Sequence, residues 1–216
     1  MSTGCPSDVR ARAAALLRRW KTDASGMAAL EFAFIVPIMA VMFIGAVELS
    51  QAIIVDRRVT QIASSTADLV ARAEQSIPQS DISDIMKAGS FIMSPYALNP
   101  LKIVLREYQS STTSATNVKM SWQCTYNGTG GTLTCACTNS TVTVPANLVG
   151  TNDAVIVSIV TYDYKPLVFD YFMKRNWGGS VAGVYTLSET IYQKPRGQWP
   201  VLVPTSGTTC TAPTFP

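Results

Sequence analysis

Gly26-Met-Ala-Ala-Leu-Glu31-Phe-Ala-Phe-Ile-Val-Pro37 opens a long apolar segment that continues to about Val55. No residue from Phe32 to Val47 is charged. An apolar run of about 18 or more residues is a candidate for a membrane-spanning helix. Glu31 is the exception, because a carboxylate inside a membrane segment is costly. Glu31 is therefore the first candidate for a functional residue.

Residues 1–26 form a basic leader in which five positive charges face two negative ones. Such a bias keeps the N-terminus in the cytoplasm and sends the following chain across the membrane. Two interpretations of the leader stay open. It is either a targeting segment that is later removed, or a basic amphipathic helix that lies on an anionic membrane surface.

A single helix is predicted from Met27 to about Gln75, with Pro37 expected to kink or loosen it. Glu48 follows Glu31 by 17 positions, which is about 26 Å along a helix and close to the thickness of a bilayer core. Beyond Glu48 the apolar residues follow a 4-3-4-3-4 spacing and make one stripe. The stripe packs either on the chain's own sheet or on other subunits. Its members are Val55, Val59, Ile62, Thr66, Leu69 and Ala73.

A basic leader that ends in Gly, followed by an apolar helix with Glu as its fifth residue, resembles the class III signal of type IV pilins and pseudopilins. The residues Gly26-Met27, Glu31-Phe32-Ala33 and Pro37 look like the TadE-like pseudopilins of the tight-adherence (Tad, or Flp) pilus system. The close resemblance covers about Gly26 to Arg72. A weaker one recurs at Tyr162-Asp-Tyr-Lys-Pro166 and Lys194-Pro-Arg196.

This resemblance implies that a prepilin peptidase cuts between Gly26 and Met27. It also implies that Glu31 pairs with the new terminal amine of a neighbouring subunit. The implied partners are other pilin-like subunits, the Tad assembly machinery and the cytoplasmic membrane. The protein would cross the inner membrane once and carry its C-terminal domain in the periplasm, and it would serve surface adherence. Places inside the filament and at its base both fit the sequence.

The remaining chain is predicted to form a short helix and an antiparallel sheet. The helix is expected from Asp81 to about Met93, with Ser80 as its N-cap, after a break around Pro78. Asn127-Gly-Thr-Gly-Gly131 indicates a hairpin between two strands. The expected strands are 101–108, 117–126, 132–138, 154–164 and 181–193, with 154–164 central; residues 167–173 are expected to be a connector and 195–216 irregular.

These elements predict an α+β fold, with a long N-terminal pilin-like helix packed on a small antiparallel β-sheet domain. The expected divisions are a leader at 1–26, a transmembrane and assembly helix at 27–76 and a periplasmic domain at 77–216. The net charge of +3 is too small to indicate nucleic-acid binding. No cofactor is predicted.

Histidine is absent from the chain, which excludes Ser-His-Asp and Cys-His catalysis and the usual zinc sites. Besides Cys5 in the leader, four cysteines follow the apolar segment: Cys124, Cys135, Cys137 and Cys210. An even number in an exported domain favours two disulfides over metal ligation. The hairpin would bring Cys124 opposite Cys135 or Cys137 and leave the other for Cys210.

Two other classes compete with the pilin interpretation. An uncut signal anchor that carries a periplasmic binding or scaffold domain is similar in plan to TadG-like proteins. A secreted protein would be cut after Ser50-Gln-Ala52, although the apolar run is long for an ordinary signal. The mature N-terminus distinguishes them: Met27 indicates a pilin-like subunit, Met1 an uncut anchor, and Ile53 a secreted protein.

Overall fold

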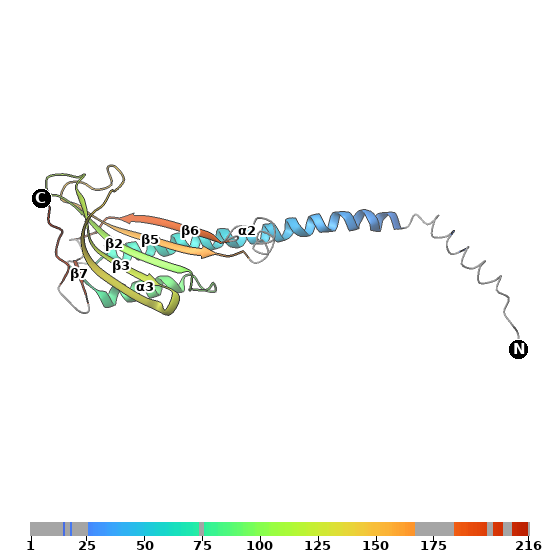
Figure 1. Ribbon diagram of the computed structural model, residues 1–216, viewed down its shortest axis with the longest axis horizontal. Coiled ribbons are helices and arrows are strands. Elements are labelled where there is room, and N and C mark those ends of the chain that lie inside the picture. The colour runs from blue at the N-terminus through green and yellow to red at the C-terminus, as the bar shows by residue number, and fades with distance from the viewer. Residues whose placement is uncertain are drawn as a thin grey trace. The chain divides into compact units, whose positions relative to one another are not determined.

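The computed structural model describes residues 26–73, 76–166, 184–197, 201–204 and 209–215, together with Ala15 and Arg18. The rest of the leader, Cys5, Gln75 and the 167–173 connector lie outside these residues. The chain divides into two compact units, Met1–Val47 and Glu48–Pro216, and each is described by itself. The elements in chain order are α2 (Met27–Ala71), β1 (Ser76–Pro78), α3 (Gln79–Phe91), β2 (Leu101–Ser110), β3 (Val118–Asn127), η2 (Thr129–Gly131), β4 (Thr132–Thr141), β5 (Ala154–Tyr164), β6 (Tyr185–Gln193) and β7 (Val201–Val203) (Figure 1).

A five-stranded antiparallel sheet forms the centre of the second unit, with strand order β4-β3-β2-β5-β6. The α+β prediction is confirmed. The predicted strand 154–164 coincides with β5, because its run of β-branched and apolar residues suits a strand buried on both faces. It is an interior strand, but β2 rather than β5 holds the centre of the sheet.

The hairpin between β3 and β4 lies where the glycines predicted it. Gly130 and Gly131 adopt positive φ angles of 76° and 60°, which glycine tolerates without steric cost. Gly128 approaches the backbone so closely that a Cβ would lie 1.9 Å from the Leu98 carbonyl oxygen. The glycines therefore make the turn and fix it against the chain that enters β2.

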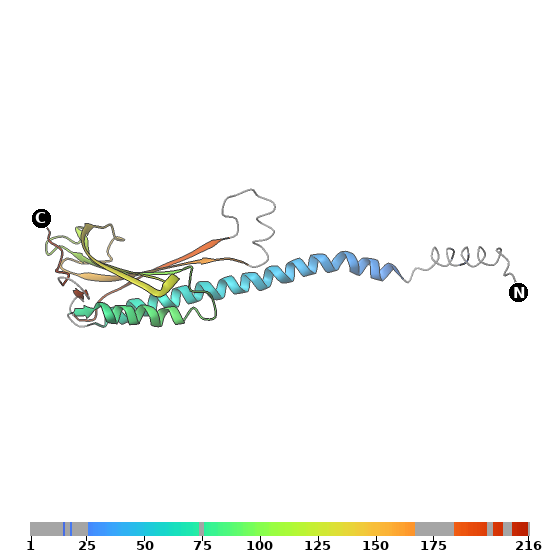
Figure 2. The same cartoon turned by 60° about the horizontal axis from the view of Figure 1, so that its bottom comes forward.

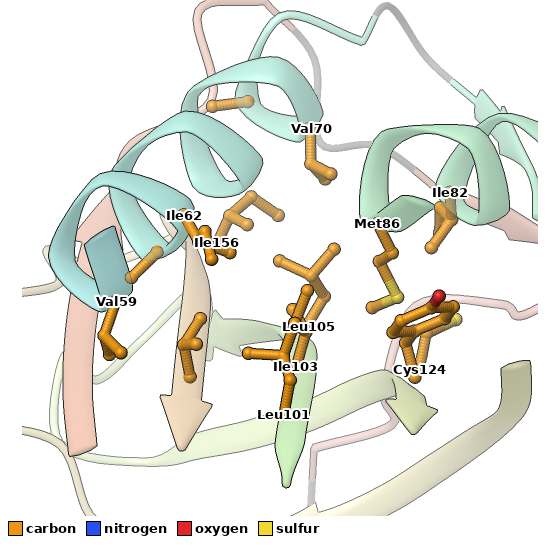
Figure 3. Close-up of a cluster of buried hydrophobic side chains, with 14 of the residues drawn as sticks. Val59, Ile62, Val70, Ile82, Met86, Leu101, Ile103, Leu105, Cys124 and Ile156 are labelled. Carbon is orange, nitrogen blue, oxygen red and sulfur yellow. The ribbon is translucent and has the colours of Figure 1, made fainter. Parts of the chain in front are cut away.

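The part of α2 in the second unit and the whole of α3 lie on one face of this sheet (Figure 2). The buried side chains of α2 are Val55, Val59, Ile62, Ala63, Thr66, Ala67, Val70 and Ala71. Together with Ile82 and Met86 of α3 they meet the inward side chains of β2, β3 and β5 (Figure 3). The predicted stripe thus packs on the chain's own sheet, which is one of the two arrangements that the sequence left open.

The assignment of one residue, Leu69, to the buried stripe is wrong. Leu69 is exposed, and Val70 takes its place in the core. A strict repeat of 3.5 residues drifts by about 20° per heptad around a straight helix. Two heptads after Val55, the predicted position has therefore turned away from the sheet.

Several other parts of the prediction differ from the structure. The strands predicted at 101–108 and 132–138 extend to Ser110 and Thr141, and the strand predicted at 181–193 is described only from Tyr185, because residues 181–183 lie outside the described part of the chain. α3 begins at Gln79 after an extended Pro78, and Ser80 donates to Asp81 Oδ1 at 3.1 Å instead of capping the helix. α2 ends at Ala71, where the backbone N–H of Arg196 donates to the Ala71 carbonyl oxygen at 2.9 Å. Residues 195–216 were expected to be irregular, but β7 pairs with β1 in parallel.

Candidate membrane and assembly segment

The predicted cleavage position lies in an open part of the first unit. Gly26 directly precedes α2 and is exposed, and no atom lies within 4 Å of the place where its Cβ would be. Met27, the first residue of α2, is also exposed. The geometry leaves the Gly26–Met27 peptide bond accessible, while cleavage at this bond stays a prediction.

The first half of α2 carries a dense apolar surface that no part of its own unit covers among the described residues. Phe34, Met42 and Phe43 each expose 70% or more of their surface. Large exposed apolar patches on a protein surface mark sites of interaction with other proteins or with a membrane. α2 is the one helix of the described chain that is long and apolar enough to cross a membrane.

Glu31 and Pro37 both lie within this exposed segment. Glu31 is exposed and interrupts an otherwise apolar surface. The helix continues through Pro37, although proline cannot donate the intrahelical hydrogen bond at this position. Pairing of Glu31 with the amine of a neighbouring subunit involves a second chain and stays a prediction.

Glu48, the first residue of the second unit, is half-buried rather than fully solvated. Tyr164 lies in its electrostatic neighbourhood. Burial first, and then the Glu48 carboxylate and Tyr96, raise the pKa of the Tyr164 hydroxyl. Glu48 thus belongs to the second unit and is partly covered by it.

The segment that follows α3 is fastened to α2 just beyond the apolar stretch. The Arg58 guanidinium donates to the carbonyl oxygens of Ile92, at 2.7 Å, and Ser94. The same guanidinium lies 5.3 Å from the centre of the Tyr96 ring, and the Tyr96 hydroxyl donates to Gln51 Oε1 at 2.5 Å. These contacts fix the base of the domain to the helix.

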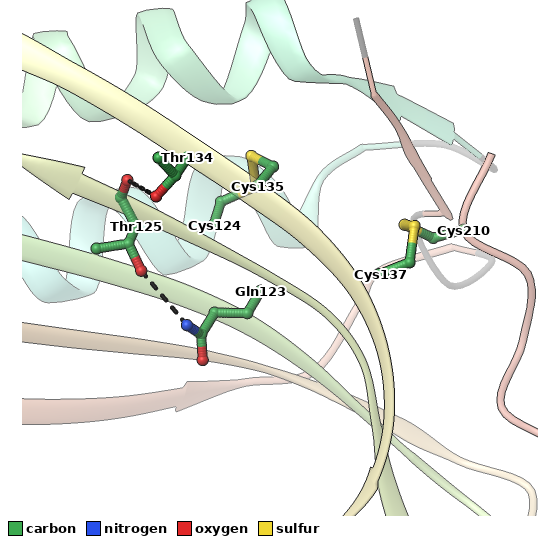
Figure 4. Close-up of a disulfide and its surroundings, with 7 residues drawn as sticks. All are labelled: Gln123, Cys124, Thr125, Thr134, Cys135, Cys137 and Cys210. Carbon is green, nitrogen blue, oxygen red and sulfur yellow. Dashed lines mark hydrogen bonds between the residues drawn. A yellow bond between two sulfur atoms is a disulfide. The ribbon is translucent and has the colours of Figure 1, made fainter. Parts of the chain in front are cut away.

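The four cysteines of the second unit form two disulfides, in agreement with the number expected. Cys124 pairs with Cys135 across β3 and β4, and Cys137 of β4 pairs with Cys210 of the C-terminal segment (Figure 4). The pairing follows from register, because Cys124 and Cys135 are direct neighbours in the antiparallel ladder whereas Cys137 lies opposite Trp122. Within the described residues no group of metal-binding side chains gathers.

The motif Lys194-Pro-Arg196 forms ion pairs with two distant parts of the second unit. Lys194 Nζ lies 2.6 Å from Asp153 Oδ2, just before β5. Arg196 Nη2 lies 2.7 Å from Asp68 Oδ1 in the last turns of α2. The positive charge of Arg196 also suits the C-terminal end of this helix. The motif therefore joins the chain after β6 to the start of β5 and to the end of α2.

Sequence reasoning missed a buried carboxyl group at the centre of the sheet. Glu107 of β2 is 0% exposed. Its Oε1 accepts a hydrogen bond from Gln109 Nε2 at 3.1 Å, and its Oε2 has no partner within normal hydrogen-bond geometry among the described residues. Burial raises the pKa of Glu107 to about 7, and the side chains of Gln109, Ser121 and Trp122 oppose this shift in part. Alternation along the strand does not mark such a residue, because both faces of β2 are largely buried.

Comparison with known families agrees with the sequence pattern. Residues 26–68 match the family model described as TadE-like protein. The predicted resemblance is confirmed over this segment. Neither a curated protein nor a solved structure matches the chain.

Proposed function

We propose that this protein is a minor pilin or pseudopilin of the Tad pilus system, with a role in assembly rather than catalysis. One observation carries the proposal. The TadE-like match begins at residue 26, and the structure begins an exposed apolar helix at Met27 with Glu31 as its fifth residue. The family match thus starts one residue before the apolar helix α2.

The membrane first holds the uncut chain. The apolar half of α2 would span the inner membrane, with the basic leader in the cytoplasm and the second unit in the periplasm. Two disulfides suit that oxidising compartment. A prepilin peptidase would then cut after Gly26 and leave a positive amine on Met27.

Assembly follows from the cost of charge in the membrane. The Met27 amine and the Glu31 carboxylate are separated by four residues, about 6 Å along the helix. Each charge is penalised in hydrocarbon when unpaired. Contact between the amine of one subunit and Glu31 of another removes both penalties. Association with other pilin-like subunits is therefore favoured, and adherence follows from the pilus that they build.

Replacing Gly26 tests the processing step. We expect Gly26→Leu to retain the leader, since a bulky side chain blocks entry of the backbone into the peptidase site. Intact mass spectrometry of protein from a strain with the peptidase should show the wild type shorter than the variant by residues 1–26.

Gly197→Leu is the matched control. It too is a glycine whose Cβ position has no atom within 4 Å, so a Cβ at either position meets open space. The control should be processed as the wild type is. Equal processing of Gly26→Leu and the wild type would contradict the cleavage assignment, and a wild type that keeps its leader would favour an uncut anchor.

A further inference from the structure

The disulfide between Cys137 and Cys210 borders an open groove at the edge of the sheet. The groove has a volume of about 420 Å³ and is lined by residues 137–139 of β4 and 209–214 of the C-terminal segment. Both cysteines of the bridge contribute to its wall. A reagent in the groove can therefore reach this bond from solvent.

The accessibility of the sulfurs distinguishes the two bridges. Cys137 is exposed on β4, whereas its partner Cys210 is 1% exposed. In the other bridge Cys124 is fully buried in the core beneath the helices, and Cys135 is half-buried against the same core. Thiol–disulfide exchange requires a thiolate to approach a disulfide sulfur, so access decides which bridge reacts.

We propose that Cys137–Cys210 is a thiol-exchange site at which an external dithiol attacks the sulfur of Cys137 and releases the C-terminal segment from β4. This inference stands independently of a role in pili.

The reaction has two balanced steps. A thiolate of the dithiol bonds to Cys137 Sγ while the Cys137–Cys210 bond breaks, and Cys210 leaves as a thiolate that takes up a proton. The second thiol of the dithiol loses its proton and attacks the mixed disulfide, which frees Cys137 as a thiolate. The dithiol is oxidised to a disulfide and the protein bridge is reduced by two electrons.

Opening the bridge would leave the C-terminal segment attached to β7, where the backbone N–H of Cys210 donates to the Leu202 carbonyl oxygen at 3.0 Å. The contacts that would still hold the segment to β3 and β4 come from Thr214 and Phe215, and Lys119 Nζ lies 5.6 Å from the centre of the Phe215 ring. Thr214 accepts a hydrogen bond at its carbonyl oxygen from Lys119 Nζ, at 2.6 Å, and one at its hydroxyl from Asn139 Nδ2, at 3.0 Å. Both contacts are exposed, and exposed contacts of this kind contribute little stability. The edge of β4 would then become more accessible to solvent.

Differential alkylation of the full chain in detergent tests the site. The oxidised protein is treated with limiting dithiothreitol, quenched with iodoacetamide, then fully reduced and labelled with the heavy reagent. We expect Cys137 and Cys210 to gain the first label together, at least about tenfold faster than Cys124 and Cys135. Equal rates for the two bridges, or faster labelling of Cys124 and Cys135, would overturn the proposal.

A trapping measurement identifies the attacked sulfur. A thioredoxin-type dithiol protein whose resolving cysteine is replaced by serine stops the exchange at the mixed disulfide. Peptide mapping should locate the adduct on Cys137, and an adduct on Cys210 or Cys124 instead would overturn the assignment. The double variant Cys137→Ser/Cys210→Ser is the control and should lose the adduct. A control that traps as much as the wild type would refute the site.

Discussion

Replacing Glu31 with glutamine is expected to abolish association with other pilin-like subunits and, with it, production of surface pili. Under the proposed pairing, the variant loses the carboxylate partner of a neighbour's Met27 amine and leaves that amine as an uncompensated charge. Breaking a buried ion pair costs about 3–5 kcal/mol, which is at least about a hundredfold in the association constant. Insertion should survive, since the substitution removes a charge from an apolar segment. Cleavage after Gly26 should survive as well.

Crosslinking in membranes, together with counts of surface pili, measures this effect. Glu48→Gln is the matched control, because it changes the same group on the same helix, 17 residues further along. Glu48 belongs to the folded second unit rather than to the exposed apolar segment, so its substitution should have the milder effect. Normal crosslinking and normal pili in Glu31→Gln would reduce Glu31 to an incidental residue.

Glu107→Gln is expected to make the domain more stable at high pH. The folded-state pKa of Glu107 is raised from 4.5 to about 7, so the folded protein binds the proton more tightly than the unfolded chain. The stability associated with this proton is fully present below about pH 4.5 and is lost as the pH rises through about 7. A glutamine has nearly the same shape and carries no charge at either pH.

The free energy of unfolding, measured with denaturant on the full chain in detergent, checks this prediction. At pH 8.5 the variant should exceed the wild type by up to about 3 kcal/mol, because each unit of pKa shift corresponds to about 1.4 kcal/mol. At pH 4 the two proteins should be similar. Glu189→Gln, on the partly exposed edge strand β6, controls for loss of a carboxylate. A Glu107→Gln variant with the pH dependence of the wild type would refute this account of the carboxyl group.

The strands and the long apolar helix were predictable because strong local patterns specify them. The apolar run after Gly26 is long, β5 is a continuous run of apolar and β-branched residues, and the Asn127-Gly pair marks the hairpin. The elements that sequence reasoning missed lack such a pattern. β1 and β7 have three residues each, and pairing between segments more than a hundred residues apart leaves no local trace.

The polar interior of the domain was also beyond sequence reasoning. Thr66 was predicted as a member of an apolar stripe. In the structure its hydroxyl donates to the Ile62 carbonyl oxygen at 2.7 Å and lies 2.9 Å from the Ser158 hydroxyl. Because the Thr66 hydrogen is used in the first contact, the Ser158 hydroxyl donates to Thr66 in the second. This contact joins α2 to β5, and only the tertiary arrangement brings the two hydroxyls together. The same holds for Glu107 and its neighbours.

The cysteine pairing shows what register adds to spacing. The sequence left Cys124 with two possible partners, because a hairpin of uncertain length places either Cys135 or Cys137 opposite it. The turn η2 fixes the ladder so that Cys135 faces Cys124. Cys137 is then left for Cys210, and the C-terminal segment is joined to the edge strand.

Sequencing the N-terminus of the mature protein, purified from membranes of a strain that makes Tad pili, tests the central claim most directly. A pilin-like subunit cut by a prepilin peptidase begins at Met27, followed by Ala28, Ala29, Leu30 and Glu31. We predict this sequence as the single product. A product that begins at Met1 would contradict the claim and indicate an uncut membrane anchor, and one that begins at Ile53 would indicate a secreted protein without the assembly helix.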